Sequence, residues 1–153
     1  MFIRALKEQD IDPIIEFSLG ASESAWSKST LQEVLKASLE STYLVKVGID
    51  ESTGKVIGYA VASHTYDQAD VQQIVVDHDF RGQSLGRKLL QGLMRDLEER
   101  GVETVFLDVR PSNEVAVNLY RSMGFECTHQ RRDYYPGVGG RREDALVFSL
   151  KCR

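Results

Sequence analysis

The sequence predicts a mixed α/β protein with one sheet and helices on both of its faces. Hydrophobic residues make up 42% of the chain and charged residues 27%, a composition that excludes a disordered or fibrous protein. The predicted elements run strands first and then strand–helix–strand–helix–strand–strand, an order that favours a sheet covered by helices. Because no internal repeat or Pro/Ser-rich linker divides the 153 residues, we expect one domain over residues 1–153.

The first half of the chain contains four predicted strands and two predicted helices. Ser and Asp residues stand where they can cap both helices. The polar segment D-E-S-T-G-K has the composition of a hairpin turn between the two strands that it joins. The expected elements are a strand at 2–5, helices at 10–18 and 29–39, and strands at 43–49, 56–64 and 71–76.

The second half begins with an amphipathic helix that ends at Gly101. One face of its 3.6-residue repeat is apolar and the other is charged or amide-bearing. The apolar face consists of Leu85, Leu89, Leu90, Leu93, Met94 and Leu97. After it we expect a strand at 103–109, a helix at 113–123 that ends at Gly124, and strands at 125–131 and 145–150.

The loop that precedes this helix has the composition of an anion-binding site. Its segment R-G-Q-S-L-G-R, residues 81–87, alternates small residues with basic and amide residues where the helix begins. A helix start carries unpaired backbone N–H groups and the positive end of the helix dipole, and glycines let a ligand approach them. The loop therefore predicts a pyrophosphate site, with a plain corner-turning loop as the alternative. Its spacing matches neither the dinucleotide fingerprint nor a P-loop.

Two further residues are candidates for chemistry because of their positions. Asp108 lies between two apolar residues near the end of a predicted strand, where a carboxylate is disfavoured by strand preference and by desolvation. A sheet edge open to water, or an ion pair with Arg110, is the structural alternative. Tyr120 lies on the apolar face of a predicted helix, where it is either part of the core or a hydroxyl that reaches the surface.

The segment R-x-x-x-x-G-R at a helix start, followed by N-x-x-A-x-x-L-Y-x-x-x-G-F, resembles the GNAT superfamily of acetyl-CoA-dependent N-acetyltransferases. The tail R-R-D-Y-Y-P-G-V-G-G-R-R-E-D-A and the pair Trp26-Ser27 are similar to its bacterial ribosomal-protein-alanine N-acetyltransferases (the RimI type). The resemblance is dense over residues 74–145 and thin before Trp26. It implies a GNAT fold, with a central mixed, mostly antiparallel sheet that splays between residues 71–76 and 103–109. The cofactor arm then enters on one side of the split and the acceptor amine on the other.

The resemblance also implies a role for each matching residue. Asp108 stands at the position of the family's general base, which is a Glu, and Tyr120 at that of its general acid. Tyr134 and Tyr135 stand where the family closes over the peptide substrate, and we group Trp26 with them as an acceptor contact. Contacts with acetyl-CoA are implied for Ile74, Val75, Val76, Arg81, Gly82, Gln83, Ser84, Leu85, Gly86, Arg87 and Asn113.

Two residues depart from the family pattern. Ser84 replaces a glycine: if the backbone there needs a positive φ, a serine costs on the order of 1–2 kcal/mol, and if not, its hydroxyl can cap the helix. Asp108 is one methylene shorter than Glu, and a misplacement of roughly 1 Å costs about 100-fold in rate. A protein α-amine has a pKa near 7.7–8.0 and a lysine amine near 10.4, so the α-amine needs about 3.4 kcal/mol less deprotonation work. Asp108 therefore favours an α-amine acceptor.

The sequence thus predicts an enzyme that transfers acetyl from acetyl-CoA to a protein N-terminus, with a ribosomal protein that begins with alanine as the implied acceptor. The alternatives are a GNAT enzyme acting on a small-molecule amine or on lysine, a CoA-binding regulatory domain that has lost catalysis, and a nucleotide-binding module. The charged residues of the tail are compatible with a solvated hairpin, a partner surface or contact with a cationic peptide: Arg131, Arg132, Asp133, Arg141, Arg142, Glu143 and Asp144.

Composition and spacing argue against several other classes. The net charge of −4 argues against general nucleic-acid binding, and no apolar run is long enough to cross a membrane. The early charges at the N-terminus are unlike a signal peptide, so we expect a cytoplasmic protein with Cys127 and Cys152 as free thiols. Because His64, His78 and His129 lack ligand-like spacing, we expect no metal.

Overall fold

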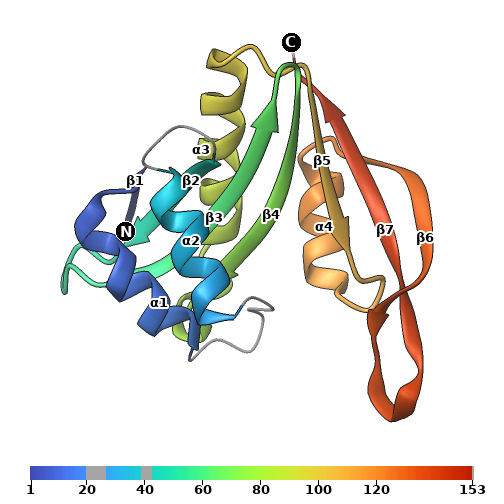
Figure 1. Ribbon diagram of the computed structural model, residues 1–153, viewed down its shortest axis with the longest axis horizontal. Helices are drawn as coiled ribbons and strands as arrows, with labels where there is room; N and C mark the ends of the chain where they lie inside the picture. Colours follow the sequence, from blue (N-terminus) through green and yellow to red (C-terminus); the bar gives the residue numbers. More distant parts are fainter. Residues whose placement is uncertain (20–26, 39–42, 153) are drawn as a thin grey trace.

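One seven-stranded sheet organises the protein (Figure 1). The computed structural model describes residues 1–19, 27–38 and 43–152. The strands are β1 (Phe2–Ala5), β2 (Tyr43–Ile49), β3 (Val56–Thr65), β4 (Gln68–Val76), β5 (Thr104–Val109), β6 (Glu126–Pro136) and β7 (Arg142–Lys151). Their order in the sheet is β1-β2-β3-β4-β5-β7-β6, and every neighbouring pair is antiparallel except the parallel pair β4 and β5.

Helices cover both faces of this sheet, which confirms the predicted fold class. The helices are α1 (Ile11–Leu19), α2 (Lys28–Ser38), α3 (Leu85–Glu99) and α4 (Glu114–Ser122), with short 3-10 turns at η1 (Glu8–Asp10), η2 (His78–Phe80) and η3 (Val138–Gly140). One apolar core joins α1 and α2 to one face, and a second core joins α3 and α4 to the other. In the part of the chain that the structure describes, no helix is both long and apolar enough to span a membrane.

The α3 helix confirms the periodicity of the sequence. Leu89, Leu90, Leu93 and Leu97 are fully buried, and Arg100 follows as the last residue before the Gly101 turn. Gly101 has a φ of +87°, the left-handed conformation in which glycine most readily ends a helix. Because the leucines fill the space beneath β2, β3 and β4, the start of α3 is held against the middle of the sheet.

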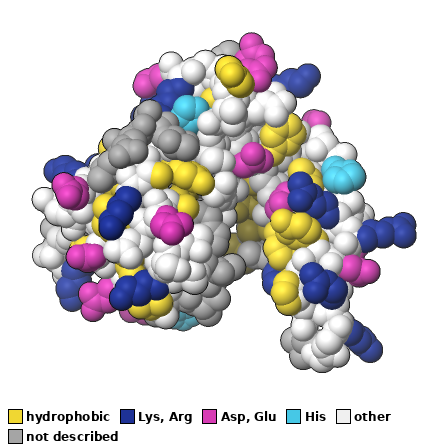
Figure 2. All heavy atoms as spheres, viewed as in Figure 1, with side chains coloured by type: hydrophobic (Ala, Val, Ile, Leu, Met, Phe, Trp, Pro, Cys, Tyr) yellow, Lys and Arg dark blue, Asp and Glu magenta, His cyan; other side chains and the backbone are white. Residues whose placement is uncertain are grey.

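The parallel pairing of β4 with β5 covers only the first part of each strand. The pairs run from Gln68↔Thr104 to Val71↔Leu107, and beyond that point the two strands diverge (Figure 1). A β-bulge places Gln72 outside the pairing of β4 with β3, and a bulge bends the strand that carries it. Figure 2 shows the surface hollowed between the part that carries β1–β4 and the part that carries β5–β7. The predicted splay of the sheet is confirmed.

Three strands extend by several residues beyond the ranges that the sequence predicted. β4 begins at Gln68, where we expected residue 71, and β6 and β7 extend to Pro136 and from Arg142, where we expected 125–131 and 145–150. Most of the added residues are polar, so an apolar pattern does not mark them. They are held in strands by cross-strand hydrogen bonding with partners that are fixed by the fold.

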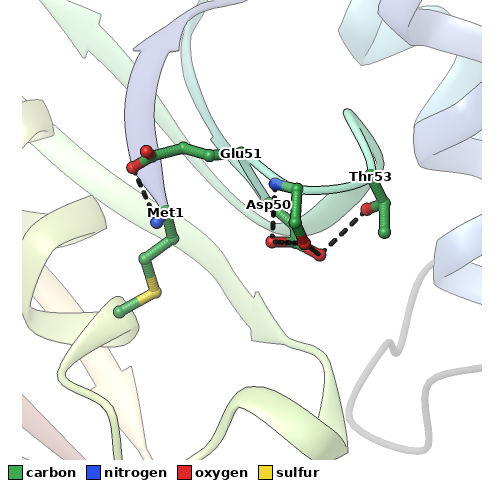
Figure 3. A network of polar contacts seen from close by, with 5 residues as sticks. Met1, Asp50, Glu51 and Thr53 are labelled. Atoms are coloured by element: carbon green, nitrogen blue, oxygen red, sulfur yellow. Dashed lines mark hydrogen bonds and ion pairs between the residues drawn. The ribbon is translucent and has the colours of Figure 1, made fainter.

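The predicted D-E-S-T-G-K turn joins β2 to β3 and also holds the N-terminus (Figure 3). The ammonium of Met1 lies 2.8 Å from a carboxylate oxygen of Glu51. Asp50 accepts hydrogen bonds from the hydroxyls of Thr53, at 2.9 Å, and Ser52, at 3.0 Å. These bonds lower the pKa of Asp50, with the Thr53 bond as the largest cause. The turn therefore secures the edge strand β1 away from the split.

Candidate active site

Asp108 lies on β5 where the sheet opens. Val105, Leu107 and Val109 are buried in the core beneath α3, so the alternation of the strand places Asp108 on the opposite face. On one side Asp108 pairs with Val147 of β7, whereas the pairing with β4 has already ended. No residue within the described ranges makes a hydrogen bond or an ion pair with its carboxylate, which is therefore available to a ligand.

The ion pair between Asp108 and Arg110 that the sequence left open does not form. Arg110 instead contacts Glu143 of β7 at 3.3 Å and donates a hydrogen bond to the carbonyl oxygen of Pro136 at 2.9 Å. Glu143 also accepts bonds from the backbone N–H of Ser112, at 2.8 Å, and from its hydroxyl, at 2.9 Å. The bonds from Ser112, and then Arg110, lower the pKa of Glu143. This network ties the loop after β5 to the β6–β7 hairpin.

Tyr120 lies on α4, with only 9% of its surface exposed. Its ring packs against Phe125 and Phe148, with centroid separations of 6.1 and 6.3 Å. Burial, and secondarily the charge of Tyr135, raise the pKa of Tyr120 to about 12. Within the described part of the chain, nothing hydrogen-bonds to its hydroxyl. Tyr120 thus keeps its proton at neutral pH and can donate it to a leaving group.

Tyr135 connects these two groups electrostatically. Burial and then the charge of Asp108 raise its pKa to about 12, and its own charge acts in turn on Tyr120. The Arg110 guanidinium lies 4.4 Å from the centre of the Tyr135 ring, and Tyr134 packs edge-on against that ring at 4.9 Å. The structure thus brings Asp108, Tyr120 and Tyr135 to one region around the split.

The β6–β7 hairpin bulges beside these tyrosines. Asp133 has a φ of +50°, and the register of β6 against β7 shifts between Arg131 and Tyr135. Asp144 accepts hydrogen bonds from the backbone N–H of Asp133, at 2.9 Å, and from the amide of Gln130, at 2.7 Å. Arg142 donates to the carbonyl oxygens of Asp133 and Tyr134. Asp144 and Arg142 therefore have structural partners inside the hairpin, and Glu143 has its partners in the loop after β5, which accounts for three of the charges that the sequence left unassigned.

The loop before α3 decides between the two alternatives for Ser84. Ser84 has a φ of +65° and makes no side-chain cap hydrogen bond, so it is the residue under backbone strain and the capping alternative is wrong. The first helical bond runs from the N–H of Lys88 to the carbonyl of Ser84 at 3.0 Å. The N–H groups of Leu85, Gly86 and Arg87 consequently lack partners inside the helix, as an anion site requires.

The other predicted cofactor residues surround the same opening. Ile74, Val75 and Val76 pair with β3 on one side only, so backbone groups on their other side face the split. Asn113 caps α4 by accepting a bond from the N–H of Ala116 at 3.2 Å, and its contact with a cofactor stays a prediction. Arg87 donates a bond of 2.6 Å to the hydroxyl of Ser122 and so joins α3 to α4. Trp26 lies outside the described residues.

Sequence reasoning missed several polar residues around the site. The hydroxyl of Tyr59 donates to the amide oxygen of Gln73 at 2.9 Å and lies 3.3 Å from the hydroxyl of Ser18. This buried cluster anchors the bulged part of β4 to α1, and no local pattern in the sequence marks it. Over the described ranges, no group of three or more His, Cys, Asp or Glu side chains is placed to hold a metal ion.

Comparisons with known proteins show what this chain is similar to. The profile of the acetyltransferase (GNAT) family matches residues 11–125. The [ribosomal protein bS18]-alanine N-acetyltransferase of Escherichia coli K12 is 36% identical over 97% of this chain and 95% of its own length. The Haemophilus ducreyi protein of the same name is 34% identical over 97% and 98%.

Solved structures give the same result for the fold. The crystal structure of the ribosomal-protein-S18-alanine N-acetyltransferase from Escherichia coli superposes with a TM-score of 0.85 and 35% identity, covering 98% of this chain and 92% of that one. A Salmonella typhimurium structure that contains acetyl-CoA has a TM-score of 0.81 at 24% identity, covering 99% of this chain and 93% of that one. The similarity to the Salmonella typhimurium structure supports the fold alone.

Proposed function

Because this chain belongs to the GNAT family and is an acetyl-CoA-dependent N-acetyltransferase, we propose that it acetylates the N-terminal α-amine of a ribosomal protein that begins with alanine. The names of its relatives support this acceptor. One observation in the structure carries the proposal: a carboxylate without a partner, Asp108, and a buried tyrosine that keeps its proton, Tyr120, lie around the opening between β4 and β5. We place the reaction in the cytoplasm.

On the cofactor side, the start of α3 holds the pyrophosphate of acetyl-CoA. Gly82, with a φ of +78°, leaves the approach open, and the N–H groups of residues 85–87 point out of the helix. Arg81 and Arg87 add positive charge near the same turn. The unpaired side of β4 at Val75 and Val76 supplies backbone N–H groups that polarise the thioester carbonyl.

On the acceptor side, Asp108 takes the proton that the amine must lose. The neutral amine nitrogen attacks the thioester carbonyl carbon and loses one proton to Asp108. The carbon–sulfur bond breaks, and the departing thiolate receives a proton from Tyr120, which regains one from water as Asp108 releases its own. With a pKa of about 12, Tyr120 is protonated throughout the neutral range. Tyr134 and Tyr135 border the acceptor, and the Arg110–Glu143 contact holds Tyr135 in place.

The short carboxylate of Asp108 suits an α-amine better than a lysine. About a tenth or more of a protein N-terminus is already neutral at pH 7, whereas the neutral fraction of a lysine amine is well below a thousandth. A base that acts through a water molecule is therefore sufficient to deprotonate an α-amine. We therefore expect the enzyme to prefer the α-amine even when the acceptor also contains lysine.

A pair of peptides tests this proposal. One begins with a free alanine amine and contains no lysine; the other has the same sequence with a blocked N-terminus and one lysine. We expect acetylation of the first peptide only, and a loss of about 10²–10⁴ in rate for Asp108→Ala. Asp67→Ala, which removes an exposed carboxylate from the β3–β4 turn, is the matched control. Faster acetylation of the lysine peptide, or binding of acetyl-CoA without any transfer, contradicts the proposal.

A further inference from the structure

The bulge in β4 lies where this strand has lost one of its two neighbours. β4 pairs with β5 only as far as Val71, and beyond that point β3 is its one strand neighbour in the described part of the chain. The bulge leaves Gln72 outside the register with β3, and a bulge disrupts the ladder and bends its strand. The path of residues 74–76 therefore depends on what holds Gln72 and Gln73.

The side chain of Gln73 is bonded to Tyr59 of β3. Tyr59 pairs with Val75 across the ladder, and its hydroxyl donates a hydrogen bond of 2.9 Å to the amide oxygen of Gln73. The Tyr59 side chain thus spans β4 from residue 75 back to residue 73. Its ring is fully buried and meets the ring of Phe17 on α1 edge-on, with a centroid separation of 6.1 Å. Tyr59 is therefore a fixed point against which the bulge is set.

This polar pair lies in an otherwise apolar core. Tyr59 belongs to the cluster that joins α1 and α2 to the sheet, and its hydroxyl also lies 3.3 Å from that of buried Ser18. Burying an amide and a hydroxyl costs free energy that their hydrogen bond only offsets, whereas an apolar pair would fill the same space without that cost. A bonded polar network instead fixes one arrangement of the elements that it joins. Here these elements are α1, β3 and the bulged part of β4.

The bulge sets the direction of the residues that face the split. Directly after it, Ile74 and Val76 pack against the α3 core and Val75 packs in the α1 core. A slip of one residue would exchange these faces and turn the backbone of residues 74–76 away from its present direction. Donors that polarise a carbonyl act only when they are aimed in advance at its oxygen, and a misplacement of roughly 1 Å costs about 100-fold in rate.

We propose that Tyr59 is a positioning residue for the transfer step. Through Gln73 it holds the bulge of β4 in place and aims the backbone groups of residues 74–76 at the thioester carbonyl. The proposal rests on the role that the proposed function gives to β4, and it is independent of which amine accepts the acetyl group.

Tyr59→Phe removes the hydroxyl and keeps the ring, and two spectroscopic measurements need no acceptor. In the protein without acetyl-CoA, we expect the amide chemical shifts of residues 74–76 to change and those of Gly82 and Gly86 to stay. With acetyl-CoA labelled by ¹³C at its carbonyl, we expect binding to the unaltered protein to move the carbonyl resonance downfield, as polarisation requires. In Tyr59→Phe this displacement should fall to half or less.

Kinetics with the alanine peptide give a separate measurement. For Tyr59→Phe we expect kcat to fall about 10–100-fold, because the thioester is no longer aimed at its donors. The KM for acetyl-CoA should change less than about threefold, since the start of α3 still binds the pyrophosphate. Ile49→Val is the matched control: it removes a methyl group from the same core at the last residue of β2, so it should lower Tm and leave kcat and the carbonyl resonance unchanged.

The proposal is overturned by a carbonyl displacement that is equal in Tyr59→Phe and the unaltered protein. A kcat within twofold of the unaltered enzyme, or an equal loss of kcat in Ile49→Val, also overturns it. If acetyl-CoA binds the unaltered protein without any carbonyl displacement, polarisation by β4 and the role of Tyr59 fail together. If the resonance responds as expected but the alanine peptide is never acetylated, the proposed acceptor fails while the assignment of Tyr59 stands.

Discussion

The two sides of the split are built in different ways. In the N-terminal part, residues 1–99 with β1–β4 and α1–α3, apolar cores cover both faces of the strands, and the core beneath α3 continues into the arm through Val105, Leu107 and Phe148. The C-terminal arm, residues 104–152, ends in the β6–β7 hairpin, where nearly every residue of β6 is exposed. Polar contacts of Arg110, Arg142, Glu143 and Asp144 hold that hairpin. Figure 1 shows the hairpin projecting beyond the rest of the sheet.

This difference predicts which part of the molecule opens more easily by local unfolding. Exposed polar contacts each contribute little to stability, whereas a fully buried leucine contributes several kcal/mol. The hairpin, which we propose borders the acceptor, therefore belongs to the less stable part of the molecule, and the α3 loop, which we propose binds the cofactor, belongs to the more stable part. The groups that we propose react lie where the two parts meet.

The largest expected effect concerns chemistry at that boundary. Asp108→Asn keeps the shape of the side chain and removes its charge, so we expect transfer to an alanine peptide to slow by about 10²–10⁴ with little change in Tm. Single-turnover rates with bound acetyl-CoA report the step directly. If the rate of Asp108→Asn lies within threefold of that of the unaltered enzyme, another group acts as the base.

The next largest effect is expected in the apolar core of the N-terminal part. Leu93 is fully buried beneath the sheet, so Leu93→Ala should lower the free energy of unfolding by about 3–5 kcal/mol. Val115→Ala, at a residue on α4 that is 82% exposed, should change it by less than about 0.5 kcal/mol. Urea unfolding measures both variants, and similar losses in the two would contradict the division into a closed part and an open arm.

Alkaline pH tests the buried tyrosine. The pKa of Tyr120 is about 12, against 10.0 for an ordinary tyrosine, so between these values the unfolded chain releases the phenol proton while the native protein keeps it. The stability is therefore intact below pH 10 and falls as the pH rises toward 12, by about 2–3 kcal/mol from this residue. Tyr120→Phe should flatten that fall in unfolding curves measured from pH 9 to 11. An unchanged slope would contradict the burial of a protonated hydroxyl.

A smaller effect is expected at the α3 loop. Ser84 holds a φ of +65° without compensation from a cap bond, so Ser84→Gly should raise the free energy of unfolding by about 1 kcal/mol. Ser84→Ala keeps the strain and is the control. Thermal unfolding distinguishes the two variants, and equal values would show that the loop relaxes.

The smallest effect on global stability is expected for the hairpin. Glu143→Gln weakens the contacts with Arg110 and Ser112, which lie at the surface. We expect faster amide hydrogen exchange in β6 and β7, a higher KM for the peptide and an unchanged KM for acetyl-CoA. A rise in the KM for acetyl-CoA would show instead that the hairpin is coupled to the cofactor side.

The sequence predicted those features that local patterns determine. The leucine face of α3 repeats every turn, and the strand that carries Asp108 was predictable from its alternating apolar residues, whereas the role of Asp108 stays a prediction. The Glu143 network was not detectable, since its partners lie 31 and 33 residues away. The sequence left two alternatives for Ser84, a strained backbone or a capping hydroxyl, because the path of the loop and not the residue type sets its φ.

We expect the start of α3 and the open side of β4 to fix the cofactor at the split. Amide chemical shifts during a titration with CoA test it most directly. We expect shifts at Gly82, Gly86 and Arg87 and along residues 74–76. It is contradicted if these amides stay unchanged while shifts cluster elsewhere, for example around the cavity of about 250 Å³ between α3 and β1, which is lined by Lys46, Lys88 and Arg95 among others.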